Sequence, residues 1–150
     1  MKIINAQVEV LKEVYKNNKQ LVYGSMGDSI VYGNGNRLYI TPKVLVGIDL
    51  HNFDNVKVVS EDALKGLTND REYEDATVTN EIVVADDGKG KLRVFKVNDE
   101  KVYVDEKLLK NFDLQGDVVT FKGKKYNCPI FIYENGVMVG LVCPVVFRGN

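Results

Sequence analysis

The chain has 150 residues, of which 45% are hydrophobic and 27% are charged, as in an ordinary globular protein. Its formal net charge of −1 gives no electrostatic reason for the whole chain to bind nucleic acid, so any basic surface must be local. No segment approaches the roughly 18 apolar residues of a membrane span, and the N-terminus lacks the apolar core of a signal peptide. We therefore expect a cytoplasmic protein with no membrane partner.

The N-terminal region predicts a helix from about Ala6 to Asn18, with Asn5 as its N-cap. The apolar residues at helical spacing, which would form its buried face, are Val8, Leu11, Val14 and Tyr15. Strands are predicted at Ser29–Tyr32 and Arg37–Ile40, on either side of a glycine turn, and at Lys43–Leu50 after Pro42. Many of these runs alternate between apolar and polar residues, which indicates sheets with one wet face.

The middle of the chain predicts a strand at Val56–Val59 that leads into a helix at Ser60–Leu67. Gly66 weakens the prediction of this helix, because glycine costs about 1 kcal/mol relative to alanine in a helix interior. The most polar stretch, Thr68–Asp75, is expected to be an exposed loop. Two further strands, 77–85 and 91–97, are rich in β-branched and aromatic residues.

The last third predicts a fixed order of elements: a strand, a helix and three strands. Their predicted ranges are 101–104, 105–112, 117–122, 129–133 and 137–142. The last two strands are joined by Glu134-Asn135-Gly136, and Asn-Gly between alternating apolar runs is the strongest short-range signal of a hairpin. This order is typical of a structural building block and points away from catalysis.

Two segments that lie 45 residues apart align without gaps, Val58–Leu67 and Tyr103–Phe112. Both begin with an apolar residue, Val, a capping residue and Glu, in that order. After two variable residues come Leu and Lys, then one variable residue and a large apolar residue. Ile3-Ile4-Asn5, with Leu11-Lys12, is a looser third copy. A period in this range indicates a repeated unit. The alternative is that any strand-to-helix junction requires an N-cap and an early acidic residue.

We therefore predict an α+β fold that is mainly antiparallel sheet, with two or three short helices and repeated strand-helix-strand-strand-strand units. The prediction is one domain over residues 1–150, which could be divided into subunits at 1–55, 56–100 and 101–150.

Both ends of the chain resemble a DNA sliding clamp of the bacterial type, a processivity factor of DNA polymerase. The start, Met1-Lys2-Ile3-Ile4 before an amphipathic helix, is similar to the opening of such a clamp. The end, Tyr103-Val104 before Leu108-Leu109 and a closing apolar strand through Pro144 to Phe147, is similar to its close. A bacterial clamp has three domains of two strand-helix units each, whereas this chain has room for one domain with up to three such units.

The resemblance implies a clamp-like domain in which helices present basic residues to the backbone of double-stranded DNA. The candidate DNA-binding residues are Lys12, Lys16, Lys19, Lys65, Lys107 and Lys110. The first three fall at i, i+4 and i+7 and so form one stripe, which could make salt-sensitive phosphate contacts. The alternative is an ordinary solvated face in which Glu9 pairs with Lys12 and Glu13 with Lys16.

Other residue types give weaker signals. His51 is the only histidine, and no nucleophile, metal-ligand or cofactor motif accompanies it. Cys128 and Cys143 lack CxxC spacing and are expected to be reduced thiols packed in strands. The segment 86–90 is interpreted as a hairpin turn, and the carboxylates Asp70, Glu72, Glu74 and Asp75 as solvated. We predict no catalytic residue, no metal site and no cofactor.

The leading hypothesis is thus a non-enzymatic binding module that resembles a sliding-clamp domain, as an accessory to DNA replication or recombination in a phage or mobile element. It would self-associate, contact the DNA backbone through lysines and bind partner proteins of unknown identity. The alternative is a protein-interaction or regulatory module that has the clamp-like fold but binds no DNA.

Overall fold

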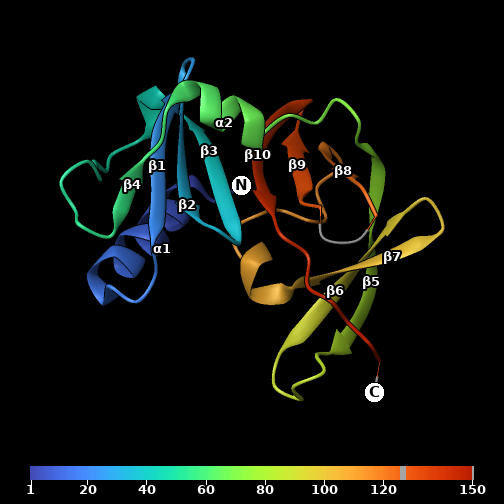
Figure 1. Cartoon of the computed structure of the whole chain (residues 1–150). Helices are drawn as coiled ribbons and strands as arrows, with labels where there is room; N and C mark the ends of the chain where they lie inside the picture. The colour runs from blue at the N-terminus through green and yellow to red at the C-terminus, as the bar shows by residue number, and fades with distance from the viewer. Residues whose placement is uncertain (126–127, 150) are drawn as a thin grey trace. The chain divides into compact units, whose positions relative to one another are not determined.

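The computed structural model describes residues 1–125 and 128–149, and the chain divides into two compact units, Met1–Asn69 and Asp70–Asn150. The described residues contain two α-helices and ten strands, most of them paired antiparallel (Figure 1). The predicted α+β fold with a mainly antiparallel arrangement is confirmed. The division at Asn69 falls inside the predicted subunit 56–100.

The first unit is a four-stranded sheet with two helices. The helices are α1 (Ile3–Lys16) and α2 (Glu61–Leu67), and the strands are β1 (Leu21–Met26), β2 (Ser29–Asn34), β3 (Arg37–Pro42) and β4 (Val56–Val58). A short 3₁₀ turn, η1 (Lys43–Leu45), follows β3. The strand order is β4-β1-β2-β3, in which β1, β2 and β3 are antiparallel and β4 is parallel to β1.

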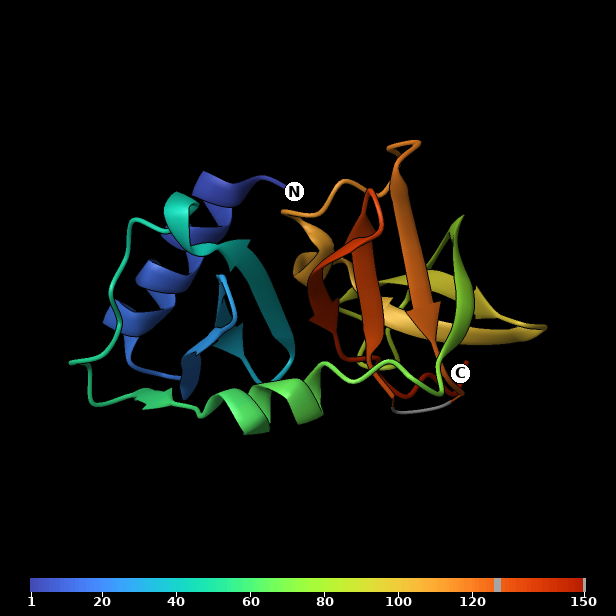
Figure 2. The same cartoon turned by 90° about the horizontal axis from the view of Figure 1, so that it is seen from above.

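The two helices of the first unit lie on opposite faces of its sheet (Figures 1 and 2). Tyr23, Tyr32 and Tyr39 are paired across β1, β2 and β3, so their side chains share one face. The helix α1 covers this face, where the Tyr39 hydroxyl lies 3.5 Å from Glu9. Gly24 points to the other face, where a Cβ at that position would lie 2.8 Å from Cδ1 of Leu64 in α2.

The helix α1 starts earlier and is rotated differently from the prediction. It begins at Ile3, and its N-cap position is Lys2, which makes no side-chain cap hydrogen bond, so the prediction of Asn5 as N-cap was wrong. The buried apolar residues are Ala6, Val10 and Val14, whereas Val8 and Tyr15 are exposed. The spacing i, i+4, i+8 suits a helix face as well as the predicted set does. Because Ile3 and Ile4 are helical, the looser third copy of the repeat has no strand.

The segment 43–50 is not a strand, which contradicts the prediction. Its backbone groups bind a side chain of α1: Gln7 donates to the carbonyl oxygen of Leu45 at 2.9 Å and accepts from the N–H of Gly47 at 2.7 Å. Because Gln7 provides hydrogen-bond partners for these backbone groups, the segment does not need a neighbouring strand to provide them. Strand β1 had not been predicted, because Gly24 and Ser25 interrupt its short apolar run.

The second unit is a six-stranded antiparallel sheet. Its strands are β5 (Glu74–Val84), β6 (Lys91–Val97), β7 (Glu100–Asp105), β8 (Val119–Gly123), β9 (Ile130–Glu134) and β10 (Val137–Val142), with a 3₁₀ turn η2 (Glu106–Leu109) after β7. The pairing runs β10-β9-β8-β5-β6-β7. Beyond β10, the N–H of Val145 donates to the carbonyl oxygen of Tyr103 at 2.8 Å, so the sheet curls until its two ends meet. Phe95 and Phe121 pack in its interior with ring centroids 5.3 Å apart.

Most of the predictions for the last third are confirmed. Strand β10 has the predicted bounds, and Asn135 and Gly136 of the hairpin turn have φ values of 52° and 77°, as a type I′ turn requires. The predicted helix at 105–112 is reduced to the 3₁₀ turn η2, with a bond from the N–H of Phe112 to the carbonyl of Leu109. Side chains at i and i+3 of a 3₁₀ turn lie directly above one another. Leu109 and Phe112 have this spacing, and both are buried.

The two aligned segments do share their local structure. Ser60 caps α2 by accepting from the N–H of Ala63 at 3.3 Å, and Asp105 caps η2 by accepting from the N–H of Lys107 at 3.0 Å. The predicted order strand-helix-strand-strand-strand therefore occurs from β4 to β7, and again from β7 to β10 with η2 in place of the helix.

Candidate functional site

The lysines predicted on the first helix are all exposed. Lys12 and Lys16 are exposed one turn apart on α1, and Lys19 is exposed just after the helix ends. The helix terminates at Asn17, which adopts a left-handed conformation and donates its N–H to the carbonyl of Glu13. A basic residue in the last turn also suits the negative end of the helix dipole.

The acidic residues of the same helix turn toward a buried arginine of β3 instead of toward these lysines. Arg37 is only 3% exposed, its Nη2 lies 3.0 Å from Oε1 of Glu13, and its Nη1 pairs with Glu9. Glu13 also accepts from Nδ2 of Asn34 at 3.0 Å. The guanidinium lies 4.6 Å from the centroid of the Tyr39 ring. These contacts bind α1 to the sheet and fix which of its faces is exposed.

This network contradicts the predicted pairing of Glu9 with Lys12 and of Glu13 with Lys16. A buried guanidinium without acceptors would cost several kcal/mol, so both carboxylates turn to Arg37. Across residues 1–125 and 128–149, no carboxylate lies within 4.0 Å of the ammonium group of Lys12, Lys16 or Lys19. The outer face of α1 therefore carries positive charge that no adjacent carboxylate neutralises.

The remaining predicted lysines are not part of this face. Lys65 is exposed on α2, on the other side of the sheet of the first unit. Lys107 lies on η2 of the second unit, close enough to Asp87 to contribute to the lowered pKa of that carboxyl, although the N–H groups of Lys89 and Gly90 contribute more. Lys110 is exposed directly after η2.

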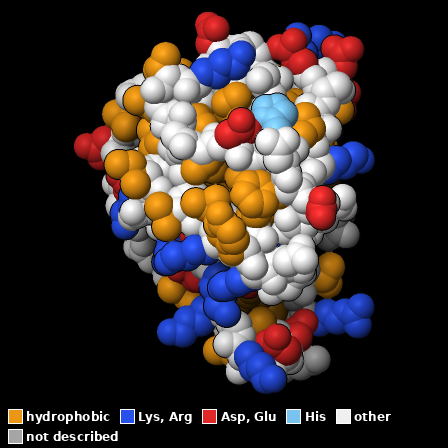
Figure 3. All heavy atoms as spheres, turned by 90° about the vertical axis from the view of Figure 1, so that its left-hand side faces the viewer, with side chains coloured by type: hydrophobic (Ala, Val, Ile, Leu, Met, Phe, Trp, Pro, Cys, Tyr) orange, Lys and Arg blue, Asp and Glu red, His pale blue; other side chains and the backbone are white. Residues whose placement is uncertain are grey.

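The single histidine is a surface residue with an acidic neighbour. His51 Nδ1 lies 2.5 Å from Oδ1 of Asp49, and both side chains are more than half exposed. Hydrogen bonds from His51 lower the pKa of Asp49, and the His51 ring packs on Tyr23 with centroids 5.0 Å apart. Figure 3 shows the histidine on the same face as a group of exposed hydrophobic side chains.

The carboxylates Glu72, Glu74 and Asp75 of the polar stretch 68–75 are exposed, as predicted, and three carboxylates of the stretch also have polar partners. The Tyr133 hydroxyl donates to Asp70, Lys124 lies 3.3 Å from Glu72, and Asn98 donates to Glu74 at 2.7 Å. The segment 86–90 is the predicted hairpin turn, in which Asp87 accepts from the N–H groups of Lys89 and Gly90. The described residues contain no group of three or more His, Cys, Asp or Glu side chains placed to hold a metal ion.

The sequence did not predict an apolar groove on the first unit. It has a volume of about 270 Å³ and lies between α1 and the segment after η1. Its apolar lining consists of Ile4, Val8, Leu11, Leu45 and Ile48. Ile4 is 76% exposed and Leu45 is 52% exposed. The groove was not predicted because Ile4 was expected to precede the helix and residues 43–50 were expected to form a strand.

Comparison of the chain with protein-family models, with curated proteins and with solved structures finds no match in any of the three. Among the helices of the described residues, none has the length and apolar character needed to cross a membrane.

Proposed function

We propose that this chain is a non-enzymatic binding module that resembles a sliding-clamp domain and contacts the backbone of double-stranded DNA through α1. Its role would be that of an accessory to DNA replication or recombination in a phage or mobile element. The contact would be independent of base sequence, because lysines placed along a phosphate backbone fix position without reading base edges.

The observation that carries the proposal is the separation of charges on α1. Glu9 and Glu13 both pair with Arg37, whereas Lys12 and Lys16 are exposed on the helix and Lys19 is exposed just after its end. A net charge of −1 for the chain does not oppose this, since phosphate contact depends on local charge. Lys65 lies on the opposite side of the sheet, so α1 alone supplies the proposed contact in the first unit.

The proposal is tested by titrating a labelled DNA duplex of random sequence with the full chain and following fluorescence anisotropy at low salt. The variant Lys12→Glu with Lys16→Glu should abolish binding, because it replaces two cations on the contact face by anions. Lys91→Glu with Lys96→Glu is the matched control, since both lysines are exposed on β6 and the charge change is the same. Equal loss of binding in both variants, or no loss in either, would overturn the proposal.

The apolar groove beside α1 favours a second candidate function, a protein-interaction module that binds no DNA. Exposed aliphatic side chains around a concave surface are typical of protein-binding sites. The second candidate predicts no DNA binding even at low salt and an unchanged molar mass in the presence of DNA. The clamp-like proposal also involves self-association, which sedimentation of the chain over a range of concentrations measures directly.

A further inference from the structure

The helix α1 carries apolar side chains on its outer surface as well as on its buried face. Four of them follow one another at i, i+4, i+7 and i+11: Ile4, Val8, Leu11 and Tyr15. At 3.6 residues per turn these positions lie within about 60° of the helix circumference, so they form one stripe. Ile4, Val8 and Tyr15 are exposed, and Leu11 is half-buried. A contiguous apolar stripe on the outer side of a surface helix is typical of a binding face.

The segment after η1 forms the second wall of the apolar groove along this stripe. Leu45 and Ile48 line the groove on that side. The buried side chain of Gln7 holds this wall against α1, because its amide binds the backbone of Leu45 at 2.9 Å and of Gly47 at 2.7 Å. The groove is therefore part of the folded first unit, and a partner does not have to form it on binding.

The helix side of the groove has a basic border. Lys12 and Lys16 directly follow Leu11 and Tyr15 in the chain, so they come next around the helix, and both are exposed. The carboxylates of α1 pair with Arg37 instead. On the face seen in Figure 3, hydrophobic side chains lie next to lysine or arginine side chains. Such a surface is complementary to a partner that carries apolar side chains beside negative charge.

The second wall does not change this balance of charge. Lys43 and Asp49 flank it in the sequence with opposite charges, and both are exposed. Oδ1 of Asp49 also lies 2.5 Å from Nδ1 of His51. The positive charge of the groove border therefore comes from Lys12 and Lys16.

We propose that the apolar groove binds an amphipathic helix of a partner protein, whose apolar side chains are bordered by aspartate or glutamate. The stripe from Ile4 to Tyr15 is about 17 Å long at 1.5 Å per residue, which matches about three turns of a partner helix. Its apolar side chains at i, i+3 or i+4, and i+7 would enter the groove. Its carboxylates would pair with Lys12 and Lys16. A concave groove suits a helix better than a flat lipid surface, which would reach only the two walls.

This inference goes beyond the proposed DNA contact and does not depend on it. Both use Lys12 and Lys16, so a partner helix and a DNA duplex would compete for α1. Only the partner helix would use the apolar groove, because a phosphate backbone offers it no apolar side chain. Substitutions in the groove therefore separate the two.

The test is titration of a fluorescently labelled helical peptide with the full chain, followed by anisotropy at low salt. The peptide has about four turns, leucine at i, i+3, i+4 and i+7, and glutamate along one flank. A second peptide has lysine in place of each glutamate. The acidic peptide should bind saturably and about tenfold more tightly than the basic peptide, which meets like charge. No binding of the acidic peptide, or equal binding of the two, would overturn the proposal.

The apolar contacts are tested by Ile4→Gln with Val8→Gln, which should weaken binding of the acidic peptide about tenfold. Both residues are exposed and glutamine is a good helix former, so the helix should be retained. Leu67→Gln with Val84→Gln is the matched control, since both residues are exposed and lie outside the groove. Equal binding by the groove variant and the unsubstituted chain, or an equal loss in the control, would count against the groove.

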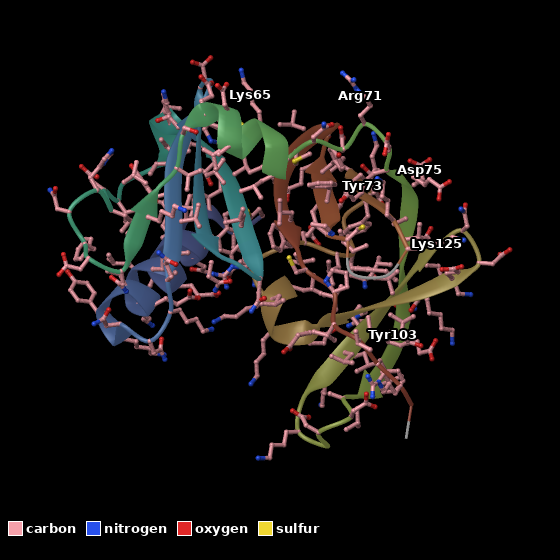
Figure 4. The ribbon with its side chains drawn as sticks, viewed as in Figure 1. Lys65, Arg71, Tyr73, Asp75, Tyr103 and Lys125 are labelled. Carbon is pink, nitrogen blue, oxygen red and sulfur yellow. The ribbon has the colours of Figure 1, made fainter. Side chains whose placement is uncertain are left out.

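The basic border is tested by Lys12→Glu with Lys16→Glu, which should also weaken binding of the acidic peptide about tenfold. The matched control is Lys57→Glu with Lys65→Glu. These lysines are exposed on β4 and α2, on the other face of the sheet, and Figure 4 shows Lys65 on α2. If the control lost as much binding as the α1 variant, net charge rather than the border would explain the affinity, and the proposal would fail.

Two other occupants of the groove would each overturn the proposal, and Ile4→Gln with Val8→Gln identifies them. A second copy of the chain would appear as a concentration-dependent dimer in sedimentation that this variant disrupts. A lipid surface would appear as cosedimentation with phosphatidylglycerol vesicles that the variant abolishes. Duplex binding should be the same in this variant as in the unsubstituted chain, so failure of the peptide to bind and failure of DNA to bind are separate results.

Discussion

Glu13 of α1 and Arg37 of β3 form an ion pair of 3.0 Å that links the lysine-bearing helix to the sheet of the first unit. The same pair determines the charge of the exposed helix face, because Glu13 would otherwise lie one turn from Lys16 on the predicted solvated surface. Stability and the proposed DNA contact therefore depend on one buried residue.

Replacement of Arg37 by methionine should destabilise the chain by about 3–5 kcal/mol, because it leaves two partly buried carboxylates without their cation. Urea denaturation followed by circular dichroism measures this change. Lys57→Met is the matched control, since Lys57 is exposed on β4, and its effect should stay within about 0.5 kcal/mol. An equally small effect for Arg37→Met would show that the ion pairs do not hold α1.

Two glycines of the first unit should respond to alanine in opposite directions. A Cβ at Gly24 would lie 2.5 Å from the carbonyl oxygen of Val59, so Gly24→Ala should cost about 1–3 kcal/mol by forcing α2 from the sheet. A Cβ at Gly66 meets no atom within 4 Å, so Gly66→Ala should stabilise α2 by about 0.5–1 kcal/mol. Thermal denaturation of both variants checks the signs, and a stabilising Gly24→Ala would contradict the close packing of α2 on β1.

The hydrogen bond from Tyr133 to Asp70 should make the second unit sensitive to acid. This bond, assisted by Lys122, holds the pKa of Asp70 below its usual value. A carboxyl with a lowered pKa stabilises the fold above its unfolded value of about 3.9, and this contribution disappears as the pH falls through the folded pKa.

Asp70→Asn should therefore cost about 1 kcal/mol at neutral pH, because it removes a charged acceptor at a partly exposed site. The cost should be smaller at pH 2 than at neutral pH, because the carboxyl of Asp70 takes up a proton as the pH falls through its lowered pKa. Urea denaturation at the two pH values measures the difference, with the exposed Asp75→Asn as a control. A cost that is the same at both pH values would rule out the ionised form of Asp70 as its source.

The parts of the fold that could be predicted from the sequence are those in which neighbouring residues determine the backbone conformation. The hairpin at Asn135-Gly136 and the capped junctions at Ser60 and Asp105 rest on short-range signals, and the structure confirms them. The segment 43–50 has the composition of a strand, but its backbone partners are atoms of Gln7, 38 and 40 residues away in sequence. No local pattern contains that contact.

The candidate site shows the same limit. The spacing of Lys12, Lys16 and Lys19 predicts one helical stripe, but the helix ends at Lys16, so only Lys12 and Lys16 lie on it and Lys19 is exposed after its end. The spacing of Glu9 and Glu13 equally predicts pairs with those lysines, and only the distant Arg37 decides against them. Arg37 is the first residue of β3, directly after a turn, and nothing in the sequence around it indicates that its side chain would be only 3% exposed.

The most direct test of the proposed DNA contact is the salt dependence of duplex binding by the unsubstituted chain. Three lysine-phosphate contacts predict that the logarithm of the association constant falls with the logarithm of the salt concentration with a slope of about −3. Lys12→Glu with Lys16→Glu should remove both the binding and its salt dependence. Binding that does not change with salt, or binding that both substitutions leave intact, would contradict the account.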